Sequence, residues 1–229
     1  SVLDVSDSSF SIITPIPSGE RAALIALYNA TNGSGWTNNS GWKTPPLDAD
    51  GFGLPGSEGT WFGVTVDPGI SVVTQIVLQN NALSGGLPAA LAGLANLGTL
   101  NLYNNQIIGP LPSEMAGLSN LQYLELSNNP IGGNMPAWMG SLSNLRELRF
   151  RYGQLTGPLP SELGGLANLQ VLDVGFNQFS GSLPASLGNL SQLQILNFVF
   201  NQFSGPVPPE FGNLTSLQKL YADYCGVGG

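Results

Sequence analysis

The strongest constraint on this chain of 229 residues is a leucine that returns every 24 residues over its C-terminal two-thirds. The spacing connects Leu97, Leu121, Leu145, Leu169, Leu193 and Leu217, and Val73 occupies the preceding place. Each of these residues opens a window with the pattern LxxLxLxxNxLxGxLPxxLxxLxx. Six full windows, from 73–96 to 193–216, and a partial seventh predict a stack of similar coils, because a fixed period of this length is typical of repeat solenoids.

The start of each window alternates between apolar and polar residues, which predicts a strand. In the second window, Leu100 and Leu102 should face the interior, whereas Thr99, Asn101 and Tyr103 should face out on the concave side. The GxLP section should return the chain, since glycine permits a tight turn and proline prevents a long helix. The sequence therefore predicts an α/β solenoid with a parallel concave sheet and one strand per 24-residue coil.

The ninth position of the windows predicts a ladder of buried asparagines. A side-chain amide at this place can bond the backbone groups of the neighbouring coil. The ladder comprises Asn81, Asn105, Asn129, Asn177 and Asn201. Two members depart from it: Cys225 can still act as a small buried group with a weak donor, whereas Gly153 has no side chain to offer. We expect the ladder to be weakest at the fourth coil.

A different pattern precedes the repeats and predicts a helical N-terminal cap. Residues 19–30 place apolar side chains on one face of a short helix, and residues 59–67 lead into a predicted edge strand before the first repeat. The loop after the helix contains Trp36, Trp42 and Trp61. Because an open solenoid end exposes its apolar column, the helix and the tryptophans should cover that end.

We expect three parts in the chain: residues 1–17 as a loosely held extension, residues 18–72 as the cap, and residues 73–229 as the repeats. Ser1 is not followed by the charged and apolar segments of a signal peptide, so we expect any signal peptide to lie outside this chain. The seventh window stops at Gly229 without a recognisable C-terminal cap. Either the array belongs to a longer protein, which we favour, or its last residues fold over the end.

The combination of LxxLxLxxN with LxGxLPxxLGxLxxL resembles the plant-type class of leucine-rich repeats, as in receptor-kinase ectodomains and polygalacturonase-inhibiting proteins. The resemblance covers residues 73–229, and ALIALYNATNGSGWTNNSGW and TWFGVTVD are similar to the cap of such arrays. Plant caps usually carry CxWxGVxC, whereas Gly59 and Val66 occupy the two cysteine places here, which favours a microbial, algal or protist relative. The resemblance implies a binding protein, usually extracellular or at the cell surface.

Composition argues against several other classes of function. Only 9% of residues are charged and the net charge is −8, which disfavours nucleic acid as a partner because phosphate neutralisation needs clustered Lys and Arg. No apolar run approaches the length of a membrane span. The chain has no histidine and a single cysteine, so histidine-activated nucleophiles and zinc sites are not expected. Asp48, Asp50 and Glu58 lack the spacing of a calcium loop. We therefore expect no enzyme, no metal and no cofactor.

The most informative surface feature is the eighth window position, which is Asn in the first three coils and aromatic in the next four. Arg149 and Arg151 lie beside these aromatics, among acidic residues that should be solvated or salt-bridged. Two interpretations fit: a structural stack with ion pairs, or a ligand patch, since aromatic and Arg side chains are common interface anchors. The predicted ligand-binding set is Tyr123, Glu125, Glu147, Arg149, Arg151, Tyr152, Asp173, Phe176, Phe200, Tyr221 and Tyr224.

The sequence thus predicts a recognition module that binds a protein, peptide or glycan through its concave face, outside the cell or on its surface. Two alternatives remain: a surface-structural or ice-binding protein, and an inhibitor of a secreted cell-wall-degrading enzyme. The concave columns are too irregular for a lattice match, because the fifth window position runs Val77, Asn101, Glu125, Arg149, Asp173, Asn197, Tyr221.

Overall fold

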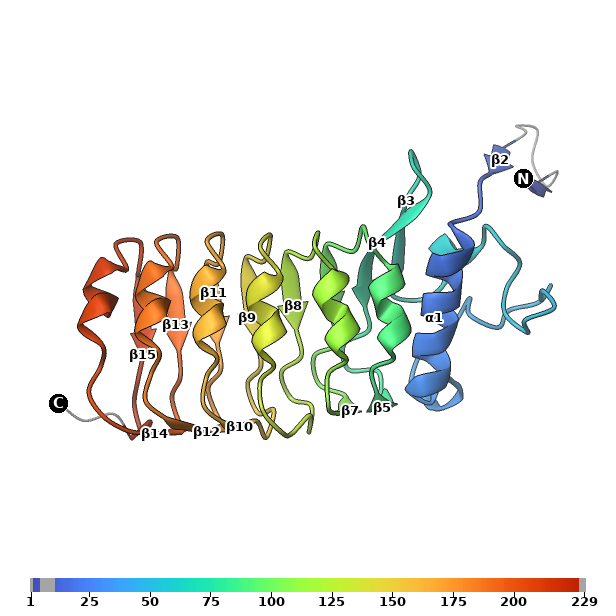
Figure 1. The fold of residues 1–229 in the computed structure, drawn as a ribbon. Coiled ribbons are helices and arrows are strands. Elements are labelled where there is room, and N and C mark those ends of the chain that lie inside the picture. The colour runs from blue at the N-terminus through green and yellow to red at the C-terminus, as the bar shows by residue number, and fades with distance from the viewer. Residues whose placement is uncertain (1, 5–10, 227–229) are drawn as a thin grey trace.

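The protein forms an array of coils, and the two ends of the chain lie at opposite extremes of the array (Figure 1). The structure is a computed structural model, and it describes residues 2–4 and 11–226. One eight-stranded sheet runs the length of the array in the order β15-β13-β11-β9-β8-β6-β4-β3. Its strands are β3 (Val64–Asp67), β4 (Val72–Val77), β6 (Thr99–Asn101), β8 (Tyr123–Glu125), β9 (Glu147–Arg149), β11 (Val171–Asp173), β13 (Ile195–Asn197) and β15 (Lys219–Tyr221). All neighbours are parallel except β3, which is antiparallel to β4.

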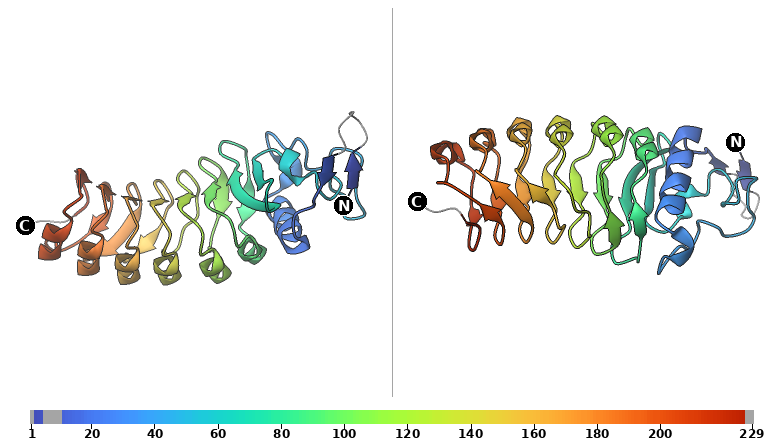
Figure 2. Two further views of the ribbon diagram at one scale, coloured as in Figure 1. Left: turned by 90° about the horizontal axis from the view of Figure 1, so that it is seen from above. Right: turned by 60° about the horizontal axis from the view of Figure 1, so that its bottom comes forward.

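The register of this sheet reproduces the sequence period, because each strand residue pairs with the residue 24 places later, as Leu172 does with Leu196. The return half of each coil carries a short 3-10 helix on the opposite side of the array (Figure 2). These helices are η3 (Ala89–Gly93), η4 (Ser113–Gly117), η5 (Ala137–Ser141), η6 (Ser161–Gly165), η7 (Ala185–Asn189) and η8 (Pro209–Asn213). Each follows the proline of the return section and is five residues long, consistent with the expectation that proline prevents a long helix there.

Two smaller sheets complete the return half. β5 (Ser84–Gly86) pairs with β7 (Gln106–Ile108), and β12 (Gln178–Gly181) pairs with both β10 (Thr156–Gly157) and β14 (Gln202–Phe203). Within the described residues, the third coil contributes only an isolated bridge between Asn134 and Thr156. The sheet on this side is therefore interrupted at the third coil.

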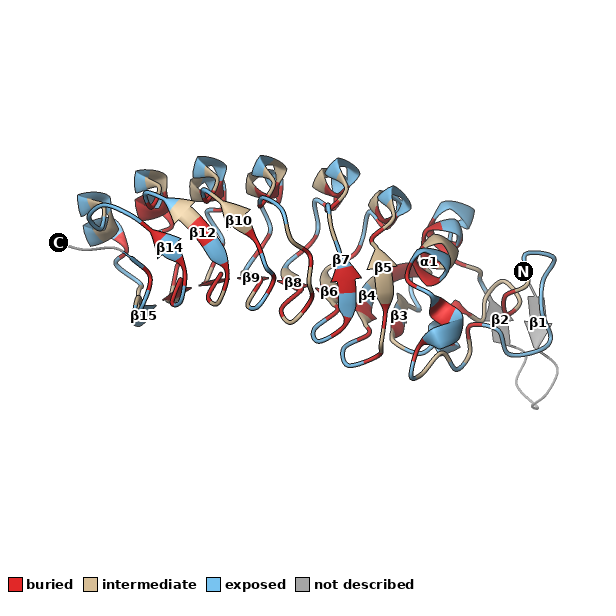
Figure 3. Ribbon diagram, turned by 90° about the horizontal axis from the view of Figure 1, so that it is seen from below, coloured by how far each residue is buried: buried red, intermediate tan, exposed pale blue. Residues whose placement is uncertain are grey.

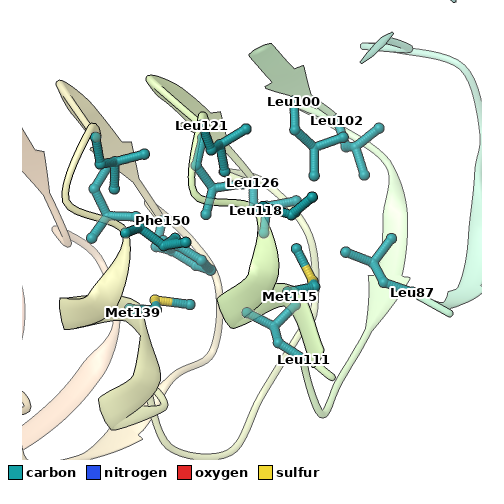
Figure 4. Packing of buried hydrophobic residues seen from close by; sticks show 14 of the residues in the cluster. Leu87, Leu100, Leu102, Leu111, Met115, Leu118, Leu121, Leu126, Met139 and Phe150 are labelled. Atoms are coloured by element: carbon teal, nitrogen blue, oxygen red, sulfur yellow. The ribbon is translucent and has the colours of Figure 1, made fainter. Parts of the chain in front are cut away.

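The core is one apolar column between the large sheet and the helical turns, and Figure 3 shows buried segments recurring from coil to coil along the array. Leu100 and Leu102 are fully buried, as the alternation predicts, and Figure 4 shows how strand leucines meet Met115 and Leu118 from the return half. Removing such a side chain from water contributes roughly 1.5–3 kcal/mol. Repetition of this packing holds the coils in register.

The asparagine ladder ties neighbouring coils together. Nδ2 of Asn105 donates to the carbonyls of Leu102 at 2.8 Å and of Leu78 in the preceding coil at 2.9 Å, while its Oδ1 accepts the N–H of Leu83 at 3.0 Å. Asn177 repeats this arrangement. Sγ of Cys225 donates to the carbonyl three residues earlier, which is the bond that a ladder asparagine makes within its own coil.

Gly153 interrupts the ladder at the fourth coil. The N–H of Ile131, which would face an asparagine there, donates to the carbonyl of Asn129 at 2.8 Å instead. Gly153 does not have a positive φ, so the backbone conformation at this position does not require glycine. The gap in the ladder adjoins the gap in the return-side sheet.

The N-terminal end of the column is sealed by α1 (Ser18–Ala30) and a cluster of aromatic residues. The helix buries Ala23, Leu24, Leu27 and Tyr28. Trp36, Trp42 and Trp61 are 5%, 0% and 1% exposed, which confirms the predicted plug. Two 3-10 turns, η1 (Gly33–Gly35) and η2 (Glu58–Thr60), shape the loop around them. The preceding extension contains an antiparallel pair, β1 (Val2–Asp4) and β2 (Ser11–Ile13).

Arg21 supplies the cation for the acidic loop that resembled a calcium site. Its Nε and Nη2 donate to the two oxygens of Asp50 at 2.9 and 3.0 Å, and its Nη1 donates to Glu58. The hydrogen bond from Arg21 lowers the pKa of Asp50. The guanidinium of Arg21 thus provides the positive charge beside Asp50 and Glu58. The described residues contain no cluster of potential metal ligands.

At the other end of the array, Leu220 is 47% exposed although its equivalents in the preceding coils, such as Leu196, are fully buried. Residues 221–226 therefore leave this side chain uncovered, and residues 227–229 lie outside the described part. No helix of the described residues is long and apolar enough to cross a membrane.

Candidate ligand-binding surface

The backbone at the eighth window position is left-handed in every coil. Its φ lies between 50° and 57° at Asn80, Asn104, Asn128, Tyr152, Phe176, Phe200 and Tyr224. Asparagine tolerates this conformation, whereas a bulky residue pays about 1–2 kcal/mol for it. The first three coils therefore use the residue that the backbone favours, and the next four do not.

The four aromatic side chains form a single stack along the array, here called the aromatic row (Tyr152, Phe176, Phe200 and Tyr224). Successive ring centroids are 4.4, 4.6 and 4.9 Å apart, with interplanar angles of 15–27°. Tyr152 is 48% exposed, Phe200 45% and Tyr224 79%. Because the rings cover one another's faces, the surface that they present to solvent consists mainly of ring edges.

Arg151 packs against the start of the aromatic row. Its guanidinium carbon lies 4.9 Å from the ring centroid of Phe176 and 5.6 Å from that of Tyr152. Its buried Nε is 3.9 Å from Oδ2 of Asp173, too far for a hydrogen bond, and has no partner in the described part of the chain. Cation–π contact therefore orients this side chain while its hydrogen-bonding capacity remains available.

The neighbouring charges are more buried than the sequence suggests. Glu147 accepts two hydrogen bonds from Arg149, at 3.0 and 2.8 Å, and is partly exposed. Glu125 and Asp173 are 8% and 6% exposed, and they lie 4.0 Å from Arg149 and 3.9 Å from Arg151, so of the two expected states, solvated or salt-bridged, the structure shows the salt-bridged one. Adjacent side chains of the closely spaced strands cover them, which position-by-position inspection of a sequence cannot reveal.

Burial raises the pKa of both carboxyl groups, and hydrogen bonds offset part of the effect. Oε1 of Glu125 accepts the N–H of Ser127 at 2.8 Å, and Oδ1 of Asp173 accepts that of Gly175 at 3.2 Å. The second oxygen of Glu125 lies 4.0 Å from Nε of Arg149. Each carboxylate thus has an oxygen that faces an arginine without a hydrogen bond to it.

These residues line a cavity of about 250 Å³ on the concave side of coils two to five. Glu125, Arg149, Arg151 and Asp173 provide its charged groups, and Tyr103 and Tyr152 its aromatic walls. Ser127 and Asn128 complete the lining. The structure thus brings five of the predicted ligand residues together in one hollow, with Phe176, Phe200 and Tyr224 extending from it as the row.

Sequence analysis missed three members of this lining: Tyr103, Ser127 and Asn128. They occupy the seventh and eighth window positions, so comparison of these positions between adjacent coils would have found them. Asn128 Nδ2 donates to the hydroxyl of Tyr103 at 3.1 Å, which fixes that wall. Three predicted residues lie elsewhere: Tyr123 is half-buried on β8, Tyr221 is 43% exposed on β15, and Glu147 on β9 lies outside the lining and bonds Arg149.

Known proteins with the same repeat match this chain. Models of the leucine rich repeat family match residues 71–131, 168–190 and 192–214. No curated protein sequence matches the chain. The leucine-rich-repeat ectodomain of the receptor kinase GASSHO1/SCHENGEN3 from Arabidopsis thaliana, solved in complex with CASPARIAN STRIP INTEGRITY FACTOR 2, is 30% identical with a TM-score of 0.76 over 88% of this chain and 23% of that one.

Two further solved structures are similar. A plant ice-binding protein is 25% identical, with a TM-score of 0.75 over 86% of this chain and 61% of that one. The Arabidopsis receptor kinase HAESA, in complex with the peptide hormone IDA and the co-receptor SERK1, is 26% identical, with a TM-score of 0.63 over 88% of this chain and 37% of that one. The chain spans less than two-thirds of each of these proteins.

The fold, the repeat pattern and these matches define a leucine-rich-repeat solenoid with a helical cap. The chain is a leucine-rich-repeat protein whose repeats are of the plant type.

Proposed function

We propose that this protein binds an extended segment of another protein or a peptide along its concave face, from the cavity on coils two to five to Tyr224. The observation that carries the proposal is the aromatic row in a left-handed backbone. Four bulky residues occupy places where asparagine avoids a cost of about 1–2 kcal/mol each. Stacking returns about 0.5–1.5 kcal/mol per pair in addition to the apolar area that the rings bury. The left-handed backbone therefore offsets part of what the row contributes to stability, and a partner that covers the exposed ring edges gives a further reason to retain it.

The surface around the row suits a peptide. β13 places the partly exposed, apolar Ile195 on the concave face, while Val171 of β11 and Val199 beside Phe200 are only 7% and 8% exposed. An extended chain could therefore place a polar residue in the charged cavity and apolar residues on the neighbouring coils. HAESA was solved with a peptide hormone, and similarity to it and to a second receptor ectodomain supports a ligand-binding role.

Glycan binding fits this surface less well. A sugar ring packs on an open aromatic face, and the faces within the row are covered by neighbouring rings at 4.4–4.9 Å. Only the two terminal rings retain an outer face. Binding rather than catalysis is inferred because the buried carboxylates adjoin arginines on an open sheet. Similarity to receptor ectodomains also supports a location outside the cell, where inhibition of a secreted wall-degrading enzyme would be one form of protein binding.

The test is a selection of displayed random peptides on the immobilised 229-residue chain, followed by affinity measurement on variants. Phe176→Asn/Phe200→Asn should weaken the selected peptides at least about tenfold. Ile108→Asn, which removes a 51% exposed apolar side chain from β7 on the other side, should leave affinity unchanged. Equal affinity for both variants, or failure to select any peptide, would contradict the proposal.

Ice binding is a second candidate, favoured by similarity to the plant ice-binding protein and by one regular row. Asn120, Asn144 and Asn168 are exposed and one coil apart, and each Nδ2 donates to a carbonyl of the preceding coil at 2.8–2.9 Å. This holds their outward groups in a repeating orientation. Thermal hysteresis by the protein, lost on Asn144→Lys, would support this function; ordinary freezing behaviour would exclude it.

A further inference from the structure

The cavity on coils two to five has a charge balance that restricts what can enter it. Its lining carries two cations, Arg149 and Arg151, and two carboxylates, Glu125 and Asp173. Arg149 also donates two hydrogen bonds to Glu147, which lies outside the lining. Arg149 lies 4.0 Å from Glu125 and Arg151 lies 3.9 Å from Asp173, so the cations and carboxylates of the lining balance one another.

The same groups leave hydrogen-bonding capacity of both kinds. The side chain of Arg151 donates no hydrogen bond to any described residue, and its terminal Nη groups, unlike its Nε, are not buried. Oδ2 of Asp173 and Oε2 of Glu125 face arginine Nε atoms at 3.9 and 4.0 Å without bonding them. A complementary group would accept from Arg151 and donate to a carboxylate at the same time.

We propose that the cavity is a specificity pocket for a primary carboxamide, that is, for an Asn or Gln side chain of the bound peptide. A carboxamide has one carbonyl acceptor and two N–H donors in one plane, which matches a guanidinium and a carboxylate side by side. It carries no charge, so it avoids both the arginines and the buried carboxylates. The inference rests on the proposed peptide-binding function and names the residue type that the site selects.

Charged side chains fit less well. An incoming Asp or Glu would approach Glu125 and Asp173, and like-charge juxtaposition at an interface costs several kcal/mol. An incoming Lys would approach Arg149 and Arg151, because each carboxylate oxygen that could accept its hydrogen bonds lies beside one of these arginines. The volume of about 250 Å³ accommodates a single side chain, with Tyr103 and Tyr152 packed against its methylene groups.

The experiment compares the residue preferences of displayed peptide libraries selected on the wild-type chain and on Asp173→Asn. On the wild type, one peptide position should favour Asn or Gln over Asp and Glu by about tenfold or more. On Asp173→Asn, the same position should accept Asp or Glu, because the repelling charge is gone. Glu125→Gln should move the preference in the same direction. It replaces Asp173→Asn in the experiment if the circular dichroism melt shows that Asp173→Asn does not fold.

Asp223→Asn is the matched control, since it makes the same chemical change at the seventh position of the last coil, outside the cavity. It should keep the wild-type preference. If peptides are selected but no position favours a carboxamide, or if the control shifts the preference as Asp173→Asn does, the carboxamide pocket is wrong while peptide binding stands. If no peptide is selected, the proposed function itself fails.

Discussion

Coils one to three and coils four to seven have the same backbone but use it differently. At the eighth position both have φ of 50–57°, yet the first three carry Asn and the other four carry Tyr or Phe. In the first group, Asn104 Nδ2 donates to Asn80 Oδ1 at 2.7 Å, which forms a small polar ladder. In the second, four rings stack beside Arg151.

The difference distinguishes two kinds of residue within one repeat pattern: those that hold the coils together and those that we propose contact a partner. Residues that suit their local conformation, such as these asparagines and the ladder at the ninth position, hold the coils together. Residues that occupy a conformation they disfavour have to be explained by what they contact, since local strain is commonly found at functional sites. Under the proposed function, the recognition surface lies mainly on coils four to seven, and its cavity extends to residues of coils two and three.

The largest effect on stability is expected at the cap. Trp61→Ala removes a side chain that is 1% exposed and packs on Trp42 with ring centroids 4.8 Å apart. Loss of a buried tryptophan should lower the free energy of unfolding by about 3–5 kcal/mol, measured by urea denaturation. Phe62→Ala, at a neighbouring but 37% exposed residue, is the control and should cost far less. Peptide affinity below the melting range should be unchanged; a loss of affinity would break the division between the two regions.

A smaller gain is expected at the boundary between the regions. Gly153→Asn would restore the missing rung and give Ile131 N–H and Leu126 C=O the partners found in other coils. An added Cβ would lie 3.2 Å from Asn177 Oδ1, a tight contact that requires a small adjustment. We expect stabilisation of about 1 kcal/mol, as for one buried hydrogen bond. An unchanged or lower urea midpoint would show that the third coil has settled into a different arrangement.

The smallest effect concerns the buried carboxyl of Asp173. Burial raises its pKa, so the folded protein binds the proton more tightly than the unfolded chain does, and stability falls as pH rises toward the folded pKa. Asp173→Asn should therefore raise the melting temperature at pH 8, and the gain should shrink as pH falls through the folded pKa. Asp50→Asn should behave oppositely: Arg21 lowers the pKa of Asp50, so its loss destabilises at neutral pH, and the deficit disappears in acid. Parallel profiles for the two variants would contradict these assignments.

The sequence predicted the scaffold because the scaffold repeats. Six copies of one pattern specify which leucines face inward, where the strand lies and where Asn105 and its equivalents bond, and the fold shows these features. The tryptophan plug followed from the need to cover an open end. Features that recur in every coil could be predicted, because the same sequence pattern in each coil is independent evidence for the structure of its neighbours.

The candidate site was only partly predictable because it depends on differences between coils. The aromatic row, its stacking and the ion pairs of its arginines could be inferred from sequence, but the left-handed φ at Tyr152 could not. The depth to which Glu125 and Asp173 are buried was not evident either, and Tyr103 joins the cavity through a hydrogen bond from Asn128. Such properties arise from the packing of several coils and no single window encodes them.

The central claim is that the aromatic row serves recognition rather than stability, and Phe176→Asn/Phe200→Asn tests it most directly. Relief of the left-handed backbone, about 1–2 kcal/mol per residue, should roughly offset the lost stacking of about 0.5–1.5 kcal/mol per pair. Melting temperature and affinity for a wild-type-selected peptide should be measured on the same sample. We predict a nearly unchanged melting temperature with affinity reduced at least about tenfold. A variant that melts far lower and binds the peptide as well as the wild type would show that the row is scaffold and that the ligand binds elsewhere.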